Sequence, residues 1–465
     1  MTTPHADPGS FRDPMSRVFV EGDTVTRALS GEALADYEAA ANTSFFSAAI
    51  EAGQIVGTER LDDTEAKALD GDWEAALRHD AIPFLSYPYE WTFEMLRDAA
   101  LLQLELTKAA VTEDVITKDA TSYNVQFVGS RPTFIDVGSF EKLRAGEPWY
   151  GYRQFCELFL FPLMFQAYKD LPFHAALRGS LDGIAPRDAR AVLAGERFRK
   201  GVISNVLLHA RLESRYAGAD GGEVRREMRR AGFSTELLAA NFRKLEKLVR
   251  SLEWKSGETA WTSYGEHNTY DDAAAASKAK FVREAAARRR ARLVWDVGCN
   301  DGRYARVAAE SADLVLAFDA DHATVDALYR RLRDEGREDI LPLVMSVTDP
   351  SPDIGWRGRE RASLERRGTP ELLLCLAIVH HVCITGNVPV REFLDWLRSL
   401  DAALVIEFPD RADPMVQRLL SGKREGSNPD YQKALFERAL QERFAIECSV
   451  PVSETRTLYA ARPQA

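Results

Sequence analysis

The residues best suited to chemistry in this chain lie in the stretch VWDVGCNDG, Val294 to Gly302. An apolar run ends in Asp296 and continues directly into a turn with Gly298 and Gly302. Glycine carries no side chain, so such a turn lets a ligand come close to the backbone. The spacing G-x-x-x-G lacks the middle glycine of dinucleotide binders. Because Asp296 and Asn300 suit a polar or cationic group, the turn predicts a nucleotide-type ligand that also carries an amino-acid moiety.

Two later stretches offer groups for a nucleoside. The run LAFDAD places Asp319 and Ala320 twenty-three and twenty-four residues after Asp296. A carboxylate at the end of a second strand can accept hydrogen bonds from both ribose hydroxyls. The run MSVTDPSPDIGW follows a third strand, and there we expect Ser346 and Val347 to lie beside an adenine ring.

A pair of histidines ends the fourth apolar run, LLLCLAIVHHVCI. A neutral imidazole at His380 or His381 could take a proton from an attacking hydroxyl, because its pKa lies near working pH. The alternative is that the two histidines simply begin a helix. Glu407, in IEFPDRADPM, is expected at the same edge of the sheet as the two histidines, where it could bind a substrate amine or hydroxyl.

The elements that position these residues alternate along the chain. After a predicted linker and helix over 256–284, apolar strands alternate with helical segments from 285 to 465 and end in a two-strand hairpin. This rhythm predicts a parallel sheet with crossover helices. The expected fold is therefore α/β and Rossmann-like, with seven strands in this domain.

With its acidic glycine turn and spaced acid, the region Arg283 to Ala465 resembles the class I S-adenosylmethionine-dependent methyltransferases. The resemblance implies S-adenosylmethionine as cofactor and no metal. It also implies that the turn binds the methionine part and that the acid after the second strand binds the ribose. Cys299 departs from the small residue common in that family, which indicates packing. The implied cofactor-binding residues are Asp296, Gly298, Cys299, Asn300, Gly302, Asp319, Ala320, Ser346 and Val347.

A second group of chemical residues lies in the N-terminal half. Asp119 precedes Asn124 by five residues in KDATSYN, and Asp136 follows twelve residues later in IDVG. This is the layout of a phosphotransferase loop, with a base and two metal ligands. Residues 17–255 resemble a kinase or aminoglycoside-phosphotransferase fold, an α+β domain with a helical C-terminal lobe.

The same region departs from that family. Lys118 precedes Asp119, and DVG replaces DFG. Neither a full glycine-rich phosphate loop nor a V-A-I-K lysine is found; the region offers only Gly22 in a predicted hairpin and Arg27 on the second strand of that hairpin. Three interpretations stay open: an active phosphotransferase, a degenerate lobe that binds substrate or serves as scaffold, and loop residues that only satisfy backbone groups.

Composition narrows the function classes. Hydrophobic residues make up 45% and charged residues 28%, as in ordinary globular proteins, while residues 1–16 are expected to be a disordered tail. A net charge of -11 argues against nucleic acid as partner. The apolar runs fall short of a membrane span, no secretion signal is found, and the five cysteines form no CxxC, so we expect a cytoplasmic protein with no membrane partner.

Most of the chain also resembles the NoeA-type nodulation and related methyltransferase proteins, through segments such as KDATSYNVQFVG and FIDVGSF. The leading hypothesis is a methyltransferase that modifies a small-molecule acceptor, by O-methylation because a histidine pair is available. The kinase-like region would help form or cover the acceptor site. The alternatives are a bifunctional phosphotransferase and methyltransferase, or an N-terminal half that is a non-catalytic interaction module. A homo-oligomer stays open.

Overall fold

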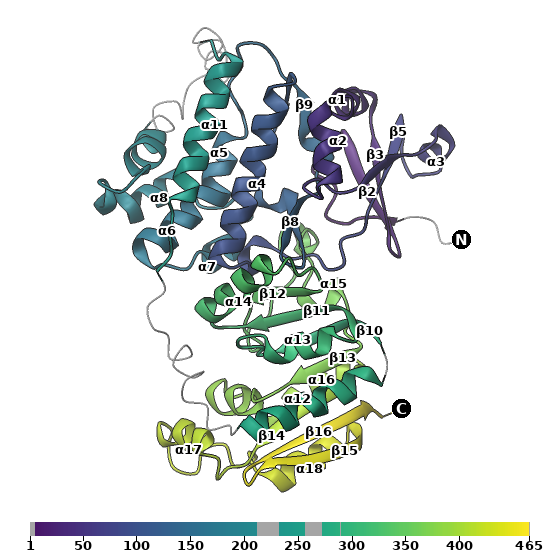
Figure 1. Cartoon of the computed structure of the whole chain (residues 1–465), viewed down its shortest axis with the longest axis vertical. Helices are drawn as coiled ribbons and strands as arrows, with labels where there is room; N and C mark the ends of the chain where they lie inside the picture. The colour runs from purple at the N-terminus through teal and green to yellow at the C-terminus, as the bar shows by residue number, and fades with distance from the viewer. Residues whose placement is uncertain (1–4, 212–231, 256–271, 289, 465) are drawn as a thin grey trace. The chain divides into compact units, whose positions relative to one another are not determined.

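The computed structural model describes residues 5–211, 232–255, 272–288 and 290–464, and it divides into two compact units (Figure 1). The first unit holds the described residues up to 127 together with 132–255 and 354–361. The second holds 128–131, 272–353 and 362–464. The predicted linker, residues 256–271, lies outside the described residues. No helix in the described ranges is long and apolar enough to cross a membrane.

The expected N-terminal tail differs from the prediction from residue 5 onward. Strand β1 (His5–Ala6) pairs antiparallel with β2 (Ser16–Glu21), so that His5 lies opposite Val20. The backbone N–H of Asp7 donates to the carbonyl of Val18 at 2.8 Å, and that of Val18 donates to the hydroxyl of Ser10 at 2.8 Å. These contacts join residues 5–10 to β2, which composition alone did not reveal.

The first unit begins with a five-stranded antiparallel sheet in the order β1-β2-β3-β5-β4. Its other strands are β3 (Thr24–Leu29), β4 (Thr58–Arg60) and β5 (Ala75–His79). The predicted hairpin at Gly22 is present, since β2 and β3 pair from Ser16–Leu29 to Glu21–Thr24. The segment that follows β3 forms two helices, α1 (Gly31–Ala41) and α2 (Ser44–Glu51). The Thr43 hydroxyl bonds the carbonyl of Ala40 at 2.5 Å, a local bond that competes with continued helix.

The rest of the first unit is mostly helical and is built around α4 (Phe93–Val111), of which most residues are buried. Two small sheets join it, β6 (Val115–Thr117) with β9 (Phe140–Lys142) and β7 (Val125–Val128) with β8 (Arg131–Phe134). The remaining longer helices are α5 (Tyr152–Phe155), η4 (Cys156–Leu160), α6 (Phe161–Lys169), α7 (His174–Gly179), α8 (Pro186–Leu193), η6 (Val202–Leu207) and α11 (Thr235–Arg250); α3 (Asp63–Lys67) lies next to β5.

The second unit contains a seven-stranded sheet in the order β12-β11-β10-β13-β14-β16-β15. The strands are β10 (Ala291–Val297), β11 (Ala312–Asp319), β12 (Ile340–Val344), β13 (Leu372–Cys375), β14 (Ala403–Pro409), β15 (Phe444–Ser453) and β16 (Arg456–Pro463). The first five in spatial order are parallel, and β16 is antiparallel to both of its neighbours. This is the predicted α/β Rossmann-like fold. The strand order reverses between β10 and β13, which is where such sheets bind ligands.

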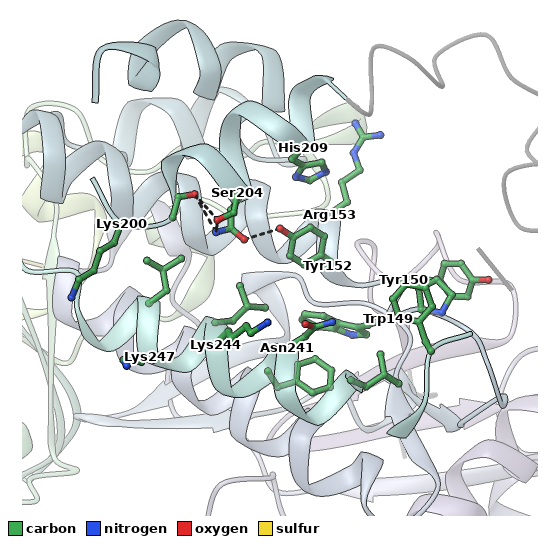
Figure 2. A pocket seen from close by; sticks show the side chains of 18 of the residues that line it. Trp149, Tyr150, Tyr152, Arg153, Lys200, Ser204, His209, Asn241, Lys244 and Lys247 are labelled. Carbon is green, nitrogen blue, oxygen red and sulfur yellow. Dashed lines mark hydrogen bonds between the residues drawn. The ribbon is translucent and has the colours of Figure 1, made fainter. Parts of the chain in front are cut away.

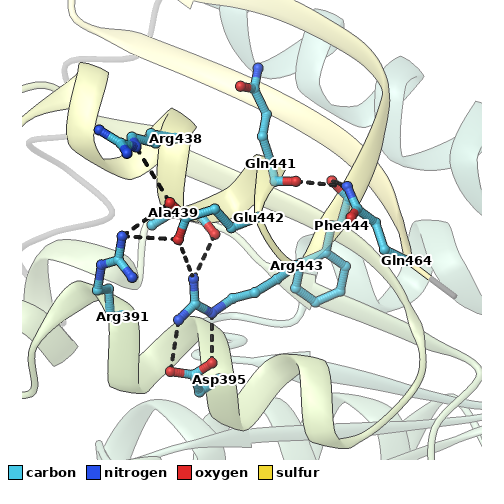
Figure 3. A network of polar contacts seen from close by, with 9 residues as sticks. All are labelled: Arg391, Asp395, Arg438, Ala439, Gln441, Glu442, Arg443, Phe444 and Gln464. Carbon is cyan, nitrogen blue, oxygen red and sulfur yellow. Dashed lines mark hydrogen bonds and ion pairs between the residues drawn. The ribbon is translucent and has the colours of Figure 1, made fainter.

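Helix α12 (Asp272–Ala287) precedes the first strand of this sheet. The helices between its strands are α13 (Arg303–Ala309), α14 (His322–Asp334), α15 (Leu364–Arg367), α16 (Val390–Ser399), α17 (Pro414–Ser421) and α18 (Lys433–Gln441). Surface ion pairs join α16 to the end of α18 (Figure 3). There Arg443 makes two bonds to Asp395, at 2.7 and 2.8 Å, and Arg391 pairs with Glu442. A bidentate pair fixes the orientation of the guanidinium as well as its distance.

Candidate functional site

The glycine turn after β10 is held against the end of β11. The backbone N–H groups of Gly298 and Cys299 both donate to the carbonyl of Phe318, at 2.9 and 3.1 Å. Gly298 and Gly302 have φ of +76°, and Asn300 has φ of +49°. A Cβ at Gly302 would lie 2.6 Å from Cδ1 of Leu328. Glycine is therefore required at 302 both by the backbone conformation and by the close approach of α14.

Asp319 lies at the end of β11 and joins the turn to the loop that follows. Its carboxylate accepts hydrogen bonds from the backbone N–H of Asn300 at 3.1 Å and of Asp321 at 3.0 Å. Burial raises its pKa, and the two backbone donors oppose that rise. Ala320, beside it, is exposed. The structure thus brings Asp319 into contact with the glycine turn, as the predicted cofactor site requires.

Asp296, at the end of β10, is only 2% exposed and is the most unusual carboxyl of this region. Its Oδ2 has no hydrogen-bond partner among the described residues. Burial raises its pKa to about 7, although the nearby Lys278 lowers it. A buried polar atom without a partner costs about 1–3 kcal/mol. The group therefore fits a ligand that brings a hydrogen-bond donor or a positive charge, as the amino-acid part of S-adenosylmethionine does.

The other predicted cofactor residues lie nearby in sequence but are less constrained. Ser346 follows β12 and forms an isolated bridge with Asp349, and its hydroxyl lies 2.9 Å from that of Thr348. Ser346 and Val347 are both half-buried. Cys299 is buried, burial raises its pKa well above the usual range, and its thiol points to the carbonyl of Asn300 at 3.6 Å. Cys299 is thus a packed neutral thiol.

His380 and His381 lie where β13 leads into the π-helix η8 (His381–Thr385). Their ring centroids are 4.1 Å apart. His380 is completely buried, and neither of its ring nitrogens has a hydrogen-bond partner in the described part of the chain. Burial and then the neighbouring His381 lower the pKa of His380 far below its usual value. Burial and Arg456 lower that of His381 to about 4.

Both imidazoles are therefore neutral at pH 7, which is the form that can accept a proton. The expected pKa near working pH is wrong, however, and a base with a pKa of about 4 is weaker than the prediction assumed. The pKa differs from the expectation because the sequence predicts that the histidines lie at the edge of the sheet but does not predict that they are buried there.

Glu407 differs from its expected role as a substrate-binding acid in an open mouth. It is completely buried on β14, where it accepts from Lys278 of α12 and lies 3.5 Å from Nη1 of Arg456. Arg456 also makes bonds of 2.7 and 3.0 Å to Asp413. The carboxylate of Glu407 is thus engaged by two cations of its own chain.

Three neighbours of this region were missed by the sequence reasoning: Lys278, Arg456 and Tyr304. Nζ of Lys278 lies 4.7 Å from the ring centroid of Tyr304, and Lys278 is 2% exposed. Lysine in the Ala-rich segment AAAASKAKF is normally a solvated helix residue, so its type gave no indication of burial. Only the packing of α12 against α13 and β15 reveals it.

The residues of the predicted phosphotransferase loop also lie together, within the first unit. Oδ1 of Asp119 accepts from Nδ2 of Asn124 at 2.7 Å and from the hydroxyl of Ser139 at 2.6 Å. Asp136 lies 2.9 Å from Nη1 of Arg27. Burial, and then the charge of Asp136, raise the pKa of Asp119 to about 6. The described residues contain no group of three acids, histidines or cysteines that could hold a metal ion.

Comparison with known proteins places the chain in a family. No protein-family profile matches it. The nodulation protein NoeA of Rhizobium meliloti (strain 1021) is 32% identical over 456 residues, which is 97% of this chain and 94% of that protein.

Solved structures similar to part of the chain include a SAM-dependent methyltransferase from Aquifex aeolicus, with 15% identity over 44% of this chain and 100% of that one, at a TM-score of 0.32. Another is the N-methyltransferase NodS from Bradyrhizobium japonicum WM9 in complex with S-adenosyl-L-homocysteine, with 11% identity over 45% of this chain and 100% of that one, at a TM-score of 0.33. The identity to NoeA and the coverage of both sequences show that this chain belongs to the NoeA family of nodulation proteins.

Proposed function

We propose that the second unit is an S-adenosylmethionine-dependent methyltransferase that acts on a small-molecule acceptor. The observation that carries the proposal is the pair of acids at the strand-order reversal, Asp296 with its unpartnered Oδ2 and Asp319 at the end of the next strand. Ligands of Rossmann-like sheets bind at this reversal. A buried acid without a partner and an acid that can face a ribose suit the two ends of this cofactor.

In this proposal the turn from Gly298 to Gly302 and Asp296 hold the methionine part, and Asp319 holds the ribose. Ser346 and Val347 contact the adenine. When bound, S-adenosylmethionine supplies a sulfonium methyl group that is intrinsically reactive toward nucleophiles. The protein then contributes chiefly the alignment of the acceptor, which alone can lower a barrier by about 7–11 kcal/mol.

The acceptor is proposed to be methylated on a hydroxyl oxygen beside His381. A neutral imidazole can accept the hydrogen bond of that hydroxyl, and His381 stays neutral at pH 7 because its pKa is held at about 4. Such a weak base orients the hydroxyl and takes its proton only late in the reaction. The proposal gives Glu407 a positioning role instead, because its carboxylate contacts Lys278 and Arg456. The prediction that the N-terminal region helps form or cover the acceptor site stays a prediction.

Calorimetric titration with S-adenosylmethionine and with S-adenosylhomocysteine tests the cofactor assignment. We expect one site per chain, and an affinity lowered about 10- to 100-fold in Asp319→Ala, since bonds to a charged acceptor contribute about 1.5–3 kcal/mol each. Asp313→Asn is the matched control, because Asp313 is a half-exposed acid at the other end of the same strand, paired with Arg290. Absence of binding to the wild type, or equal affinity of both variants, would refute the proposal.

A second candidate function, phosphotransfer or nucleotide binding by the first unit, is favoured by its strand pairing. The sheet order β1-β2-β3-β5-β4, with helices between β3 and β4, is followed by the pairs β6–β9 and β7–β8. Asp119 and Asn124 lie between β6 and β7, and Asp136 lies between β8 and β9. These positions support a kinase-like fold and match the roles expected of a base and two metal ligands.

The ion pair of Arg27 with Asp136 supports a degenerate site over an active one. The guanidinium lies at the carboxylate that would have to bind magnesium, at 2.9 Å. We therefore expect Mg·ATP to bind weakly or not at all to the wild type, and Arg27→Gln to leave Asp136 available. Calorimetry with Mg·ATP decides this. Magnesium-dependent binding to the wild type that is lost in Asp136→Ala would support an active phosphotransferase, and no binding to either the wild type or Arg27→Gln would leave a non-catalytic module.

A further inference from the structure

A cavity of about 880 Å³ lies in the helical part of the first unit, away from Asp119 and Asp136 in the sequence and not lined by them. Its walls come from the segment Pro148–Arg153, from η6 with the residues around it, and from one face of α11 (Figure 2). The volume falls within the range of about 300–1,000 Å³ that is typical of small-molecule sites. Neither the methyltransferase proposal nor the phosphotransferase loop uses this space.

The interior of the cavity is apolar. Trp149 is 7% exposed and Phe242 is 1% exposed, and their rings meet edge to face with centroids 5.0 Å apart. Leu245 and Leu248 continue the same face of α11, because each lies three residues after the previous member of the series that starts at Phe242. Such a lining favours an apolar ligand body, because each buried methylene contributes about 0.8 kcal/mol.

Two lysines lie close together at one end of this cavity. Lys200 precedes Gly201, Lys247 precedes Leu248, and a Cβ at Gly201 would lie only 2.6 Å from Cδ2 of Leu248. Figure 2 shows both lysine side chains at the same end, with Lys244 further along α11. Gly201, with φ of +78°, allows this close approach of η6 to α11.

None of these three lysines, Lys200, Lys244 and Lys247, forms an ion pair within the described part of the chain. Elsewhere on α11, Glu246 pairs with Lys108 of α4 at 2.5 Å, and Arg250 pairs with Glu105 at 2.7 Å. No Asp or Glu is among the described residues that line the cavity, so no acid of the lining offsets these three charges. Their charges are complementary to an anion.

We propose that this cavity binds an amphipathic anion, with an alkyl or flat apolar body between Trp149, Phe242 and Leu245 and an anionic headgroup at Lys200 and Lys247. Lys244 contributes to the same positive potential. Exposed lysines add modest binding energy each, but they select the charge of the headgroup. The site is distinct from the methyl-donor site, and the proposal does not depend on the methyltransferase assignment.

Calorimetry on the full chain with decanoate, decyl phosphate and decan-1-ol tests the proposal. We expect one saturable site for at least one of the two anions, with decan-1-ol about tenfold weaker or more, and an anion affinity about tenfold lower in Lys200→Gln/Lys247→Gln with decan-1-ol unchanged. The matched control is Arg243→Gln, an exposed cation on α11 that does not line the cavity. Its affinities should equal those of the wild type.

A second pair of variants tests where the apolar body lies. Leu245→Trp fills the cavity and should weaken all three probes, and Ser204→Trp at an exposed lining position serves if Leu245→Trp fails to fold. The proposal is overturned if neither anion binds saturably, if decan-1-ol binds as well as the anions, or if Arg243→Gln lowers anion affinity as much as the lysine variant does. It is also overturned if filling the cavity leaves all affinities unchanged.

Discussion

Lys278 on α12 donates its ammonium to the carboxylate of Glu407 on β14, and the two side chains are 3% and 0% exposed. Burial lowers the pKa of Lys278, while the charge of Glu407 opposes that shift. Arg456 lies on the other side of Glu407 and is itself held by Asp413. These four residues join α12, β14, β16 and the start of α17 through buried charges.

We expect Lys278→Met to destabilise the chain by about 3–5 kcal/mol, because removing one partner leaves a buried carboxylate without its closest cation. Urea unfolding measures the change. The matched control is Lys280→Met, since Lys280 is two residues away on the same helix and its pair with Glu284 is exposed; we expect a change within about 0.5 kcal/mol there. If both variants lose the same free energy of unfolding, the buried pair contributes no more to stability than the exposed pair does.

The double variant Lys278→Met/Glu407→Gln separates charge from packing. If the uncompensated charge dominates the loss in Lys278→Met, neutralising Glu407 as well should recover part of the stability. Asp413 keeps Arg456 paired in this variant, because that bidentate contact does not involve Glu407. If the double variant has a clearly lower free energy of unfolding than Lys278→Met, the charge argument is contradicted.

Because of Asp296, the stability of the folded chain should depend on pH, and the direction of the change follows from its raised pKa. Its pKa is about 7 in the folded chain against an ordinary value of 3.8, so between these values the folded state holds a proton that the unfolded state has lost. Its contribution to stability is therefore fully present below pH 4 and is lost as the pH rises to 7, by a few kcal/mol. Asp296→Asn cannot titrate, so its stability relative to the wild type should increase from pH 4.5 to pH 7.5.

Urea unfolding at several pH values measures this difference. Comparing the two proteins at each pH cancels the contribution of His380 and His381, whose lowered pKa values act in the opposite direction. A difference that is constant from pH 4.5 to 7.5 would show that Asp296 is ionised throughout this range and would contradict the raised pKa.

The fold of the second unit was predictable because the sequence repeats one physical pattern. The five predicted strands before the closing hairpin, from Val294 onward, are short apolar runs, and parallel strands buried on both faces require such runs. The glycine turn was predictable for the same reason, since only glycine takes φ of +76° at Gly298 and Gly302 without strain.

The electrostatics of the site were not predictable in this way. Whether Glu407 faces a substrate or a lysine depends on α12, which precedes β14 by more than a hundred residues and whose burial no local pattern encodes. The same holds for His381, whose position after β13 was foreseen but whose lowered pKa follows from burial and from Arg456 on β16. Tertiary packing, not residue type, decides these properties.

His381 can be examined without knowing the acceptor. With histidine labelled at Cε1, its NMR signal, assigned by its absence in His381→Gln, should not titrate between pH 5.5 and 8, because burial and Arg456 hold its pKa at about 4. Free histidine in the same buffer is the control and titrates near pH 6.5. A midpoint for His381 above 6 would restore it as a base with a pKa matched to neutral pH.

Gly302→Ala tests the packing of the cofactor turn against α14. The new Cβ would lie 2.6 Å from Leu328, and the left-handed backbone adds strain of about 1–2 kcal/mol. Gly336→Ala is a matched control, because Gly336 also has positive φ, +64°, but no atom within 4 Å of a Cβ. We expect Gly302→Ala to cost about 1–3 kcal/mol more in urea unfolding than Gly336→Ala, and Leu328→Ala in the same chain to remove part of that excess. Equal costs for the two glycine variants would mean that backbone strain alone, without the contact to Leu328, requires glycine at 302.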